Sequence, residues 1–245
     1  MLEGLRAAAT GMTAQQQKMD ALSNDIANVN TNGYKHERTS FRDLVASKTG
    51  LGGASAVSAG AGAATQSAGR GWGQGVLQTT DQPLDVAIQG AGFLQVKRAD
   101  GSTALTRNGA LQVDVRGRLA TSDGTLLQPP VTLPAGITPD DVKIGPDGTL
   151  MAQGKPIGRM TLVTVAAPHE LQDAGDGMYT TTAASGRPRA AGNGTTLAQG
   201  VLEASNVDLG DAMVEMMAAQ RSFQMASQAV RTQDQMLSIA NGIKQ

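Results

Sequence analysis

The sequence predicts an α+β protein, with long N-terminal and C-terminal helices that pair as a coiled coil and a central antiparallel β domain between them in the chain. Apolar residues recur at helical spacing near both ends, whereas residues 81–202 combine short apolar runs with glycine turns. We therefore divide the chain into an N-terminal helix and turn (1–35), a flexible Gly/Ala-rich connecting segment (36–80), the β domain (81–202) and a C-terminal helix (203–245).

The first helix is predicted from a seam of residues at alternating steps of three and four, which is coiled-coil spacing. Its members are Leu5, Ala8, Met12, Gln15, Met19, Leu22, Ile26 and Val29. A helix over about 2–29 would be roughly 40 Å long, and a seam of that length requires a partner helix in water. Asn30–Gly33 should end the helix, with Gly33 at a positive φ.

The connecting segment begins with a short amphipathic piece, residues 36–48, for which we expect a helical turn anchored by Phe41. Gly or Ala occupies 16 of the 26 positions from Gly50 to Gly75, too little apolar bulk to order the chain alone. We therefore expect disorder there in the monomer. The alternating glycines at 69–75 lack the strand, helix and Gly-Lys-Ser/Thr of a phosphate-binding loop. Trp72 either anchors a contact between subunits or folds back onto its own domain.

The β domain is predicted from alternating runs such as Leu84–Ile88 and from glycines spaced seven or eight residues apart, which indicate hairpins. These glycines are Gly101, Gly109, Gly117 and Gly124. Residues 159–165 form the clearest later strand.

The C-terminal helix should be capped by Ser205–Asp208 and carries two apolar stripes. The first stripe contains Met213, Met216, Phe223, Val230 and Leu237; the second contains Val214, Met217, Met225, Ala229, Met236, Ile239 and Ile243. One partner helix would not cover both, so we expect the leftover stripe to meet other copies; the alternative is a single intramolecular hairpin with a wide apolar face. The five methionines suit either several non-identical neighbours or plain core filling.

Composition argues against several classes of function. The net charge of -1 selects neither nucleic acid nor an anionic membrane, and the absence of cysteine excludes disulfides and thiolate sites. We expect no transmembrane segment and no cleaved signal peptide. His36 and His169 are too isolated to be ligands or bases, and the aspartates lie in turns. The chain is therefore expected to be no enzyme, with no catalytic, cofactor or metal site.

The segment Ser23–Lys35 resembles the Asn-Asn-Leu-Ala-Asn-x-x-Thr-x-Gly-Phe-Lys signature of bacterial flagellar rod and hook axial proteins, and departs from it at Asp25. Gln82–Val96, Ala104–Gly109 and Glu203–Asp208 resemble further signatures of that family. The matching motif residues are Asn24, Ala27, Asn28, Thr31, Gly33, Tyr34, Lys35, Ser205, Asn206 and Val207. The seam residues expected to drive assembly are Leu5, Met12, Met19, Leu22, Ile26, Val29, Met213, Met216, Met217, Phe223, Val230 and Leu237.

This resemblance implies a structural subunit of the flagellar basal-body rod, of distal type, that self-assembles into a hollow helical shaft and transmits torque across the periplasm. It also implies partners: other copies, neighbouring rod and hook subunits, and the type III export apparatus, which uses no cleaved signal. The alternatives are a proximal-rod or hook-type paralogue, or a non-flagellar β-domain binding module whose helices close a small oligomer.

Overall fold

The computed structural model describes residues 2–45, 60–134, 136–192 and 194–242. Its chain forms two compact units. The helical unit comprises Met1–Ala27, Glu37–Ala68 and Asp208–Gln245, and the β unit comprises Asn28–His36 and Gly69–Val207. The turn after the first helix therefore belongs to the β unit rather than to the helix it follows.

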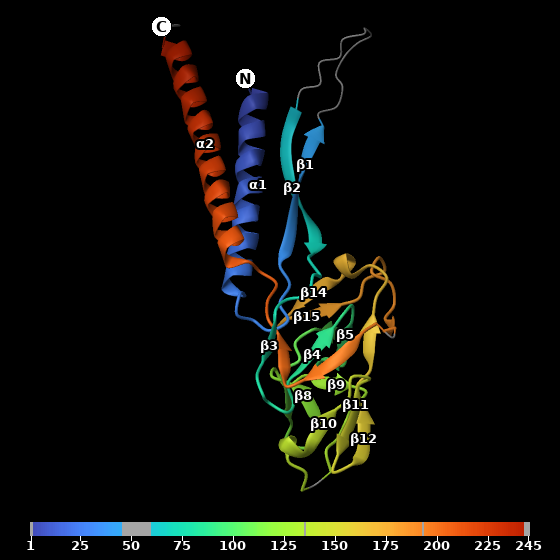
Figure 1. The fold of residues 1–245 in the computed structure, drawn as a ribbon. Helices are drawn as coiled ribbons and strands as arrows, with labels where there is room; N and C mark the ends of the chain where they lie inside the picture. The colour runs from blue at the N-terminus through green and yellow to red at the C-terminus, as the bar shows by residue number, and fades with distance from the viewer. Residues whose placement is uncertain (1, 46–59, 135, 193, 243–245) are drawn as a thin grey trace. The chain divides into compact units, whose positions relative to one another are not determined.

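The helical unit is built on α1 (Leu2–Ala27) and α2 (Leu209–Gly242), which pack against each other (Figure 1). The pair is antiparallel, because Lys18 Nζ lies 2.8 Å from Glu215 Oε2 while Gly4, near the start of α1, lies beside Gln233. Asp208 caps α2 by accepting a hydrogen bond from the Asp211 amide at 3.1 Å. The predicted pairing of the terminal helices and the predicted cap are confirmed.

A two-stranded hairpin completes the helical unit: β1 (Glu37–Val45) pairs with β2 (Gly60–Arg70). The helical turn expected at Phe41 is wrong, because this piece is the strand β1 and packs on α1. Backbone pairing across the hairpin orders residues that composition alone would leave unfolded, so the structure has a strand at residues 60–70 where we expected none. Of the rest of this prediction, residues 50–59 lie outside the described residues, and residues 71–75 are held in the β unit by contacts of Trp72, Gly73 and Gly75.

The β unit contains sixteen strands in the described residues, and each pairing between them is antiparallel. Their bounds are β3 (Leu77–Thr79), β4 (Val86–Gln89), β5 (Phe93–Lys97), β6 (Thr103–Thr106), β7 (Leu111–Val113), β8 (Leu119–Thr121), β9 (Leu126–Gln128), β10 (Val142–Ile144), β11 (Thr149–Ala152), β12 (Lys155–Arg159), β13 (Leu162–Thr164), β14 (Gln172–Gly175), β15 (Met178–Thr180), β16 (Arg189–Ala190), β17 (Thr196–Gln199) and β18 (Val201–Glu203). Short 3-10 helices occupy Pro139–Asp141 and Pro168–Glu170. The predicted central antiparallel β structure is confirmed.

The predicted hairpins follow the chain in order. Strands β5–β6, β7–β8 and β8–β9 pair, and Gly101, Gly117 and Gly124 in their turns have φ between 76° and 84°. Gly109 differs, because it has no positive φ and is required for space: a Cβ there would strike the Val86 carbonyl. The strand expected over residues 159–165 is two strands, β12 and β13, interrupted at Met160.

The core of the β unit is aliphatic. Leu94, Val96, Leu127 and Leu150 are at most 1% exposed within one cluster that runs through most of the strands. The first and last strands close this unit, because β4 pairs with β17 and β3 pairs with β18. The chain therefore enters and leaves the β unit on neighbouring strands, which brings the residues before β3 close to those after β18.

Candidate functional site

The predicted helix seams lie where α1 and α2 can share them. Leu5, Met12, Met19, Leu22 and Ile26 are all half-buried on α1. On α2 the half-buried seam residues are Met216, Phe223 and Val230, and the fully buried positions are the small residues Ala212 and Ala219. The side chain of Leu237 lies outside the described part of the chain, and Val29 belongs to the turn of the β unit.

A second face of α2 is apolar and open to solvent. Met213 and Met217, predicted as seam residues, are 50% and 51% exposed, and Met225 is 67% exposed. Val214, Met236 and Ile239 are also exposed. The second stripe of the sequence is therefore not covered by α1 in one chain.

Motif residues from separate parts of the chain meet in the β unit, around one buried carboxylate. Glu203, at the end of β18, is 1% exposed. Its Oε1 accepts from Lys35 Nζ at 2.5 Å and from the Gly75 amide at 2.9 Å, and its Oε2 accepts from Arg107 Nε at 3.0 Å. Its backbone carbonyl accepts from the Gly33 amide at 2.7 Å. We call Lys35, Arg107 and Glu203 the ion cluster.

Both cations of the ion cluster use their remaining donors on backbone carbonyls. Lys35 Nζ donates to Gly73 O at 2.8 Å, and Arg107 donates to Gly90 O and Gly92 O, both at 3.2 Å. Burial lowers the pKa of Lys35, against the hydrogen bond and charge of Glu203, which raise it. In this group both cations contact the one carboxylate and also donate to backbone carbonyls, so the group holds three chain segments together.

Asn206 makes a second junction beside the ion cluster. Its Oδ1 accepts from the His36 amide at 2.9 Å, and its Nδ2 donates to Gly71 O at 2.7 Å. His36, expected to be an ordinary surface residue, is thus half-buried against Asn206. Gly33 has the positive φ that the sequence predicted, 71°, and a Cβ there would lie 2.7 Å from the Arg107 carbonyl carbon. The turn can therefore take no larger residue without moving that backbone.

The remaining motif residues are divided between the two units. Tyr34 and Ser205 are buried, Val207 is half-buried, and Thr31 Oγ1 donates to Asn28 Oδ1 at 3.1 Å within the turn. Asn24 and Ala27 lie at the exposed end of α1. Nearby, the departing residue Asp25 is buried and accepts from the Glu37 amide at 3.1 Å, which ties β1 to α1.

Trp72 folds back onto its own β unit. Its ring lies edge-on to Phe93 and Tyr179, with ring centroids 4.9 Å apart in both pairs. The Arg70 guanidinium lies 5.2 Å from the Tyr34 ring centroid and 5.5 Å from that of Tyr179, and Arg70 also pairs with Asp173. Burial raises the pKa of Tyr179 to about 12. Of the two interpretations of Trp72, contact within its own unit is the one observed.

Sequence reasoning missed Glu203 and Arg107, although both stand in quoted motifs. The signal available was a charged residue in each of three separated motifs: the cations Lys35 and Arg107, and the anion Glu203, which can pair with both. Periodicity does not show this, because the three residues lie in turns and at a strand end rather than on one helix face.

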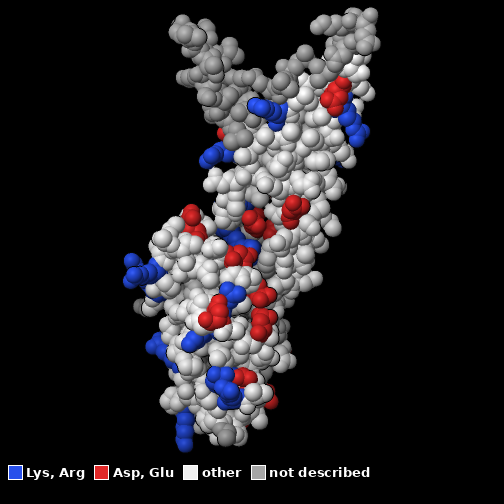
Figure 2. Space-filling view, turned by 180° about the vertical axis from the view of Figure 1, so that it is seen from behind, with Lys and Arg blue, Asp and Glu red and all other residues white. Residues whose placement is uncertain are grey.

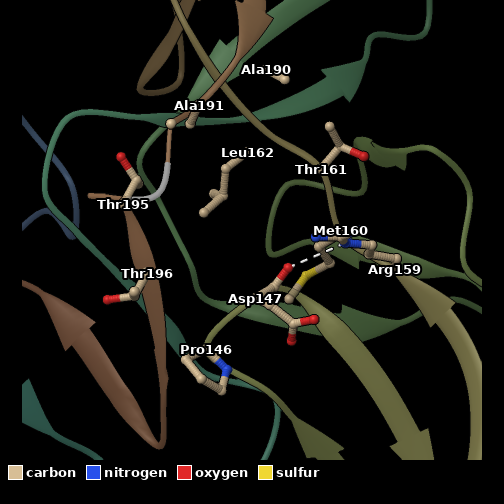
Figure 3. Close-up of a pocket in the computed structure, with 11 residues that line it drawn as sticks. Pro146, Asp147, Arg159, Met160, Thr161, Leu162, Ala190, Ala191, Thr195 and Thr196 are labelled. Carbon is tan, nitrogen blue, oxygen red and sulfur yellow. Dashed lines mark hydrogen bonds between the residues drawn. The ribbon is translucent and has the colours of Figure 1, made fainter.

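One hollow of the β unit, of about 450 Å³, lies between Pro146, Leu162 and Thr195 (Figure 3). Its charged groups stabilise the local turn: Arg159 Nε donates to Asp147 O at 3.3 Å, and the Asp147 carboxylate accepts from Thr149.

Among the described residues no three His, Cys, Asp or Glu side chains gather as a metal site. On the face in Figure 2, acidic and basic side chains are interspersed. Within the described ranges no helix is long and apolar enough to cross a membrane.

The paired terminal helices, the aliphatic β unit and the buried ion cluster together form a framework in which the charged groups join separate chain segments. Comparison with known proteins identifies the class of protein. Residues 5–35 match the family "Flagella basal body rod protein", residues 87–152 match "Flagellar hook protein FlgE/F/G D1 domain", and residues 198–243 match "Flagellar basal body rod FlgEFG protein C-terminal". The chain belongs to the flagellar basal-body rod protein family, which is structural and not enzymatic.

Full-length relatives agree with this assignment. The chain is 35% identical to the flagellar basal-body rod protein FlgG of Caulobacter vibrioides, across 99% of this chain and 100% of that one. It is 37% identical to FlgG of Bacillus subtilis, across 97% of both chains. It is also 32% identical to the rod protein FlgF of Salmonella typhimurium, across 95% of this chain and 94% of that one. The family resemblance of the sequence motifs is thereby confirmed.

Proposed function

We propose that this chain is a distal-rod subunit that self-assembles into a hollow helical shaft, spans the periplasm and transmits torque. The observation that carries the proposal is the exposed apolar face of α2, in a chain whose full-length relatives are rod proteins. Water disfavours so much exposed apolar surface along one helix, and association with further copies removes it. The seam residues of the two helices drive assembly, and the motif residues hold together the chain segments that meet at Glu203 and Asn206.

The test of self-assembly is sedimentation of the purified protein over a range of concentrations, followed by electron microscopy. We expect growth into filaments above a threshold concentration, because a helical assembly has no closed end point. A discrete small oligomer at every concentration would instead identify the closed binding module, and the shaft proposal would be wrong.

The distal position is supported by the 35% and 37% identities to FlgG proteins, against 32% to the FlgF protein. Basal bodies from a strain lacking this chain distinguish the alternatives. A distal subunit should leave a truncated rod with its first part in place, whereas a proximal subunit should leave no rod. A complete rod without a hook would identify a hook-type paralogue.

The proposed partners are neighbouring rod and hook subunits and the export apparatus, with export that removes no signal peptide. Mass spectrometry of the subunit from isolated basal bodies tests the export route. We expect the N-terminal peptide to be intact, since Leu5 and the rest of the α1 seam are needed in the assembled shaft. A subunit whose chain begins within α1 would contradict both statements.

We also propose that the chain divides into four parts, with boundaries after residues 35, 80 and 202. In the assembled shaft, the connecting segment 36–80 becomes ordered by contacts with neighbouring subunits. Val76 and Leu77, which follow Trp72 closely in the sequence, are exposed apolar residues and are available for such contacts. Deletion of residues 50–68, part of which lies outside the described residues, stops before the β unit resumes at Gly69 and should leave that unit folded but give bent or short filaments. Straight filaments of normal length would show that the segment is only a linker.

A further inference from the structure

The helical unit has a groove on the side of α1 that faces the hairpin. Two adjoining hollows of about 360 and 390 Å³ share Gln17 of α1 and Thr65 of β2. The first is lined by small residues, among them Ala9 and Ala64, and the second contains the carboxylates of Asp20 and Glu37. We call these two hollows the α1–hairpin groove.

The lining of the groove suits a partner with long side chains. Ala, Thr and Ser dominate the walls, so the backbones of α1 and β2 are accessible to projecting groups. At Gly62 the backbone of β2 already approaches Thr10 so closely that a Cβ would strike it. A helix carrying flexible, unbranched side chains fills a channel of this kind well.

The exposed face of α2 carries side chains of that type. At 100° per residue, Met213, Met217 and Met225 fall on one side of the helix, and Arg221 and Arg231 fall within the same arc. Both arginines are exposed, and neither has an ion-pair partner among the residues that the structure describes. We call these five side chains the α2 outer face.

Charge completes the match between the two surfaces. The carboxylates of Asp20 and Glu37 in the groove have no cationic partner in the described parts of the chain, and the α2 outer face supplies two unpaired guanidinium groups. Opposite unpaired charges on two exposed surfaces favour their encounter and fix its orientation.

One chain cannot bring these surfaces together. The groove residues of α1 lie on the opposite side of the helix from the seam that contacts α2, so α1 stands between α2 and the hairpin (Figure 1). The partner of each surface must therefore come from another molecule. Since the two surfaces differ, each added copy leaves one of each open, which produces an unending helical array unless a rotation closes a ring.

We propose that the α2 outer face of one copy docks in the α1–hairpin groove of the next copy, with its arginines against the groove carboxylates. This inference rests on the proposed self-assembly and adds which two surfaces of the helical unit form a contact between neighbouring subunits.

Site-specific photo-crosslinking tests the contact directly. A benzophenone amino acid at Thr13, an exposed groove residue, should crosslink in assembled protein to peptides from residues 209–242 of another copy. Benzophenone at Ser23, exposed on α1 but outside the groove, is the matched control and should not capture the α2 outer face. Dilute monomer should give no crosslinked dimer from either position.

The outcomes distinguish a failure of the docking contact from a failure of the proposed self-assembly. If the unsubstituted protein never assembles, the proposed function fails. If it assembles but Thr13 captures a different segment or nothing, the docking contact is wrong and the function stands.

Charge reversal provides the second measurement. Asp20→Arg should raise the critical concentration for assembly by about tenfold, equivalent to about 1.4 kcal/mol, since like charges then meet in the contact. Two double variants combine Asp20→Arg with Arg221→Glu or with Arg231→Glu. One of these double variants should assemble at the critical concentration of the unsubstituted protein. Unchanged assembly of the Asp20→Arg protein, or no recovery in either double variant, would overturn the charge pairing.

Discussion

Replacing Glu203 with Gln should unfold the β unit at a much lower temperature. The substitution keeps the size of the side chain but removes the only anion between Lys35 and Arg107, whose side chains are 0% and 3% exposed. It also turns an NH₂ group toward donors that need an acceptor. Removing one partner of a buried ion pair costs about 3–5 kcal/mol, a large part of the roughly 5–15 kcal/mol that stabilises a folded domain.

The assay is thermal unfolding followed by the fluorescence of Trp72, the only tryptophan, which lies in the β unit against Phe93 and Tyr179. At about 2–4 °C per kcal/mol for a domain of this size, the Tm should fall by roughly 10 °C. Glu170→Gln is the matched control, because Glu170 is 52% exposed in the same unit, and its Tm should change by at most about 2 °C. A Glu203→Gln protein that unfolds with the control would refute a stabilising role for the ion cluster.

Three further predictions concern the seam, the turn and a buried phenol. Leu22→Asp should place an unpaired charge in the α1–α2 contact and abolish filament growth while Trp72 fluorescence stays native; filaments of normal length would count against the seam. Gly33→Val should cost more than about 1 kcal/mol, seen as a lower Tm, since it adds a clash to the strain of a positive φ. Gly101→Ala, at a φ of 84° with open space around it, measures the strain alone, and equal losses would exclude the clash. Tyr179, with its pKa raised to about 12, stabilises the fold fully below pH 10 and loses that contribution between pH 10 and about 12, so the wild-type Tm should fall more steeply there than that of Tyr179→Phe; parallel curves would contradict the shifted pKa.

Periodicity predicted the helices well because it reports a property of a single element. The first helix and the Asp208 cap were predicted from local patterns of spacing and side-chain chemistry, and the structure contains both. The hairpin turns at Gly101, Gly117 and Gly124 were predictable for the same reason, since each depends on a few consecutive residues.

The features that escaped prediction depend on residues far apart in the chain. The composition of strand β2 predicts disorder, whereas its pairing with β1 and its contacts with α1 order it in the structure. Glu203 and Lys35 are 168 positions apart, so no window of sequence contains both. A family motif marked the positions of the ion cluster without showing that its members touch one another.

The pairing of the first strands of the β unit with its last ones also determines when this unit can fold. Gln89 of β4 pairs with Thr196, and Thr79 of β3 pairs with Val201. More than a hundred residues separate the partners of each pair, and all of them must be available before the pair forms. Closing loops of that length costs entropy before any contact compensates for it, which makes folding slow and dependent on the whole chain. A chain delivered from its N-terminus therefore lacks the partners of β3 and β4 until residue 203 has emerged, and the same late strand brings the carboxylate that fixes Lys35. Until that moment the local hairpins between β5 and β9 have all their residues, but the β unit lacks both of its closing strand pairs and its ion cluster.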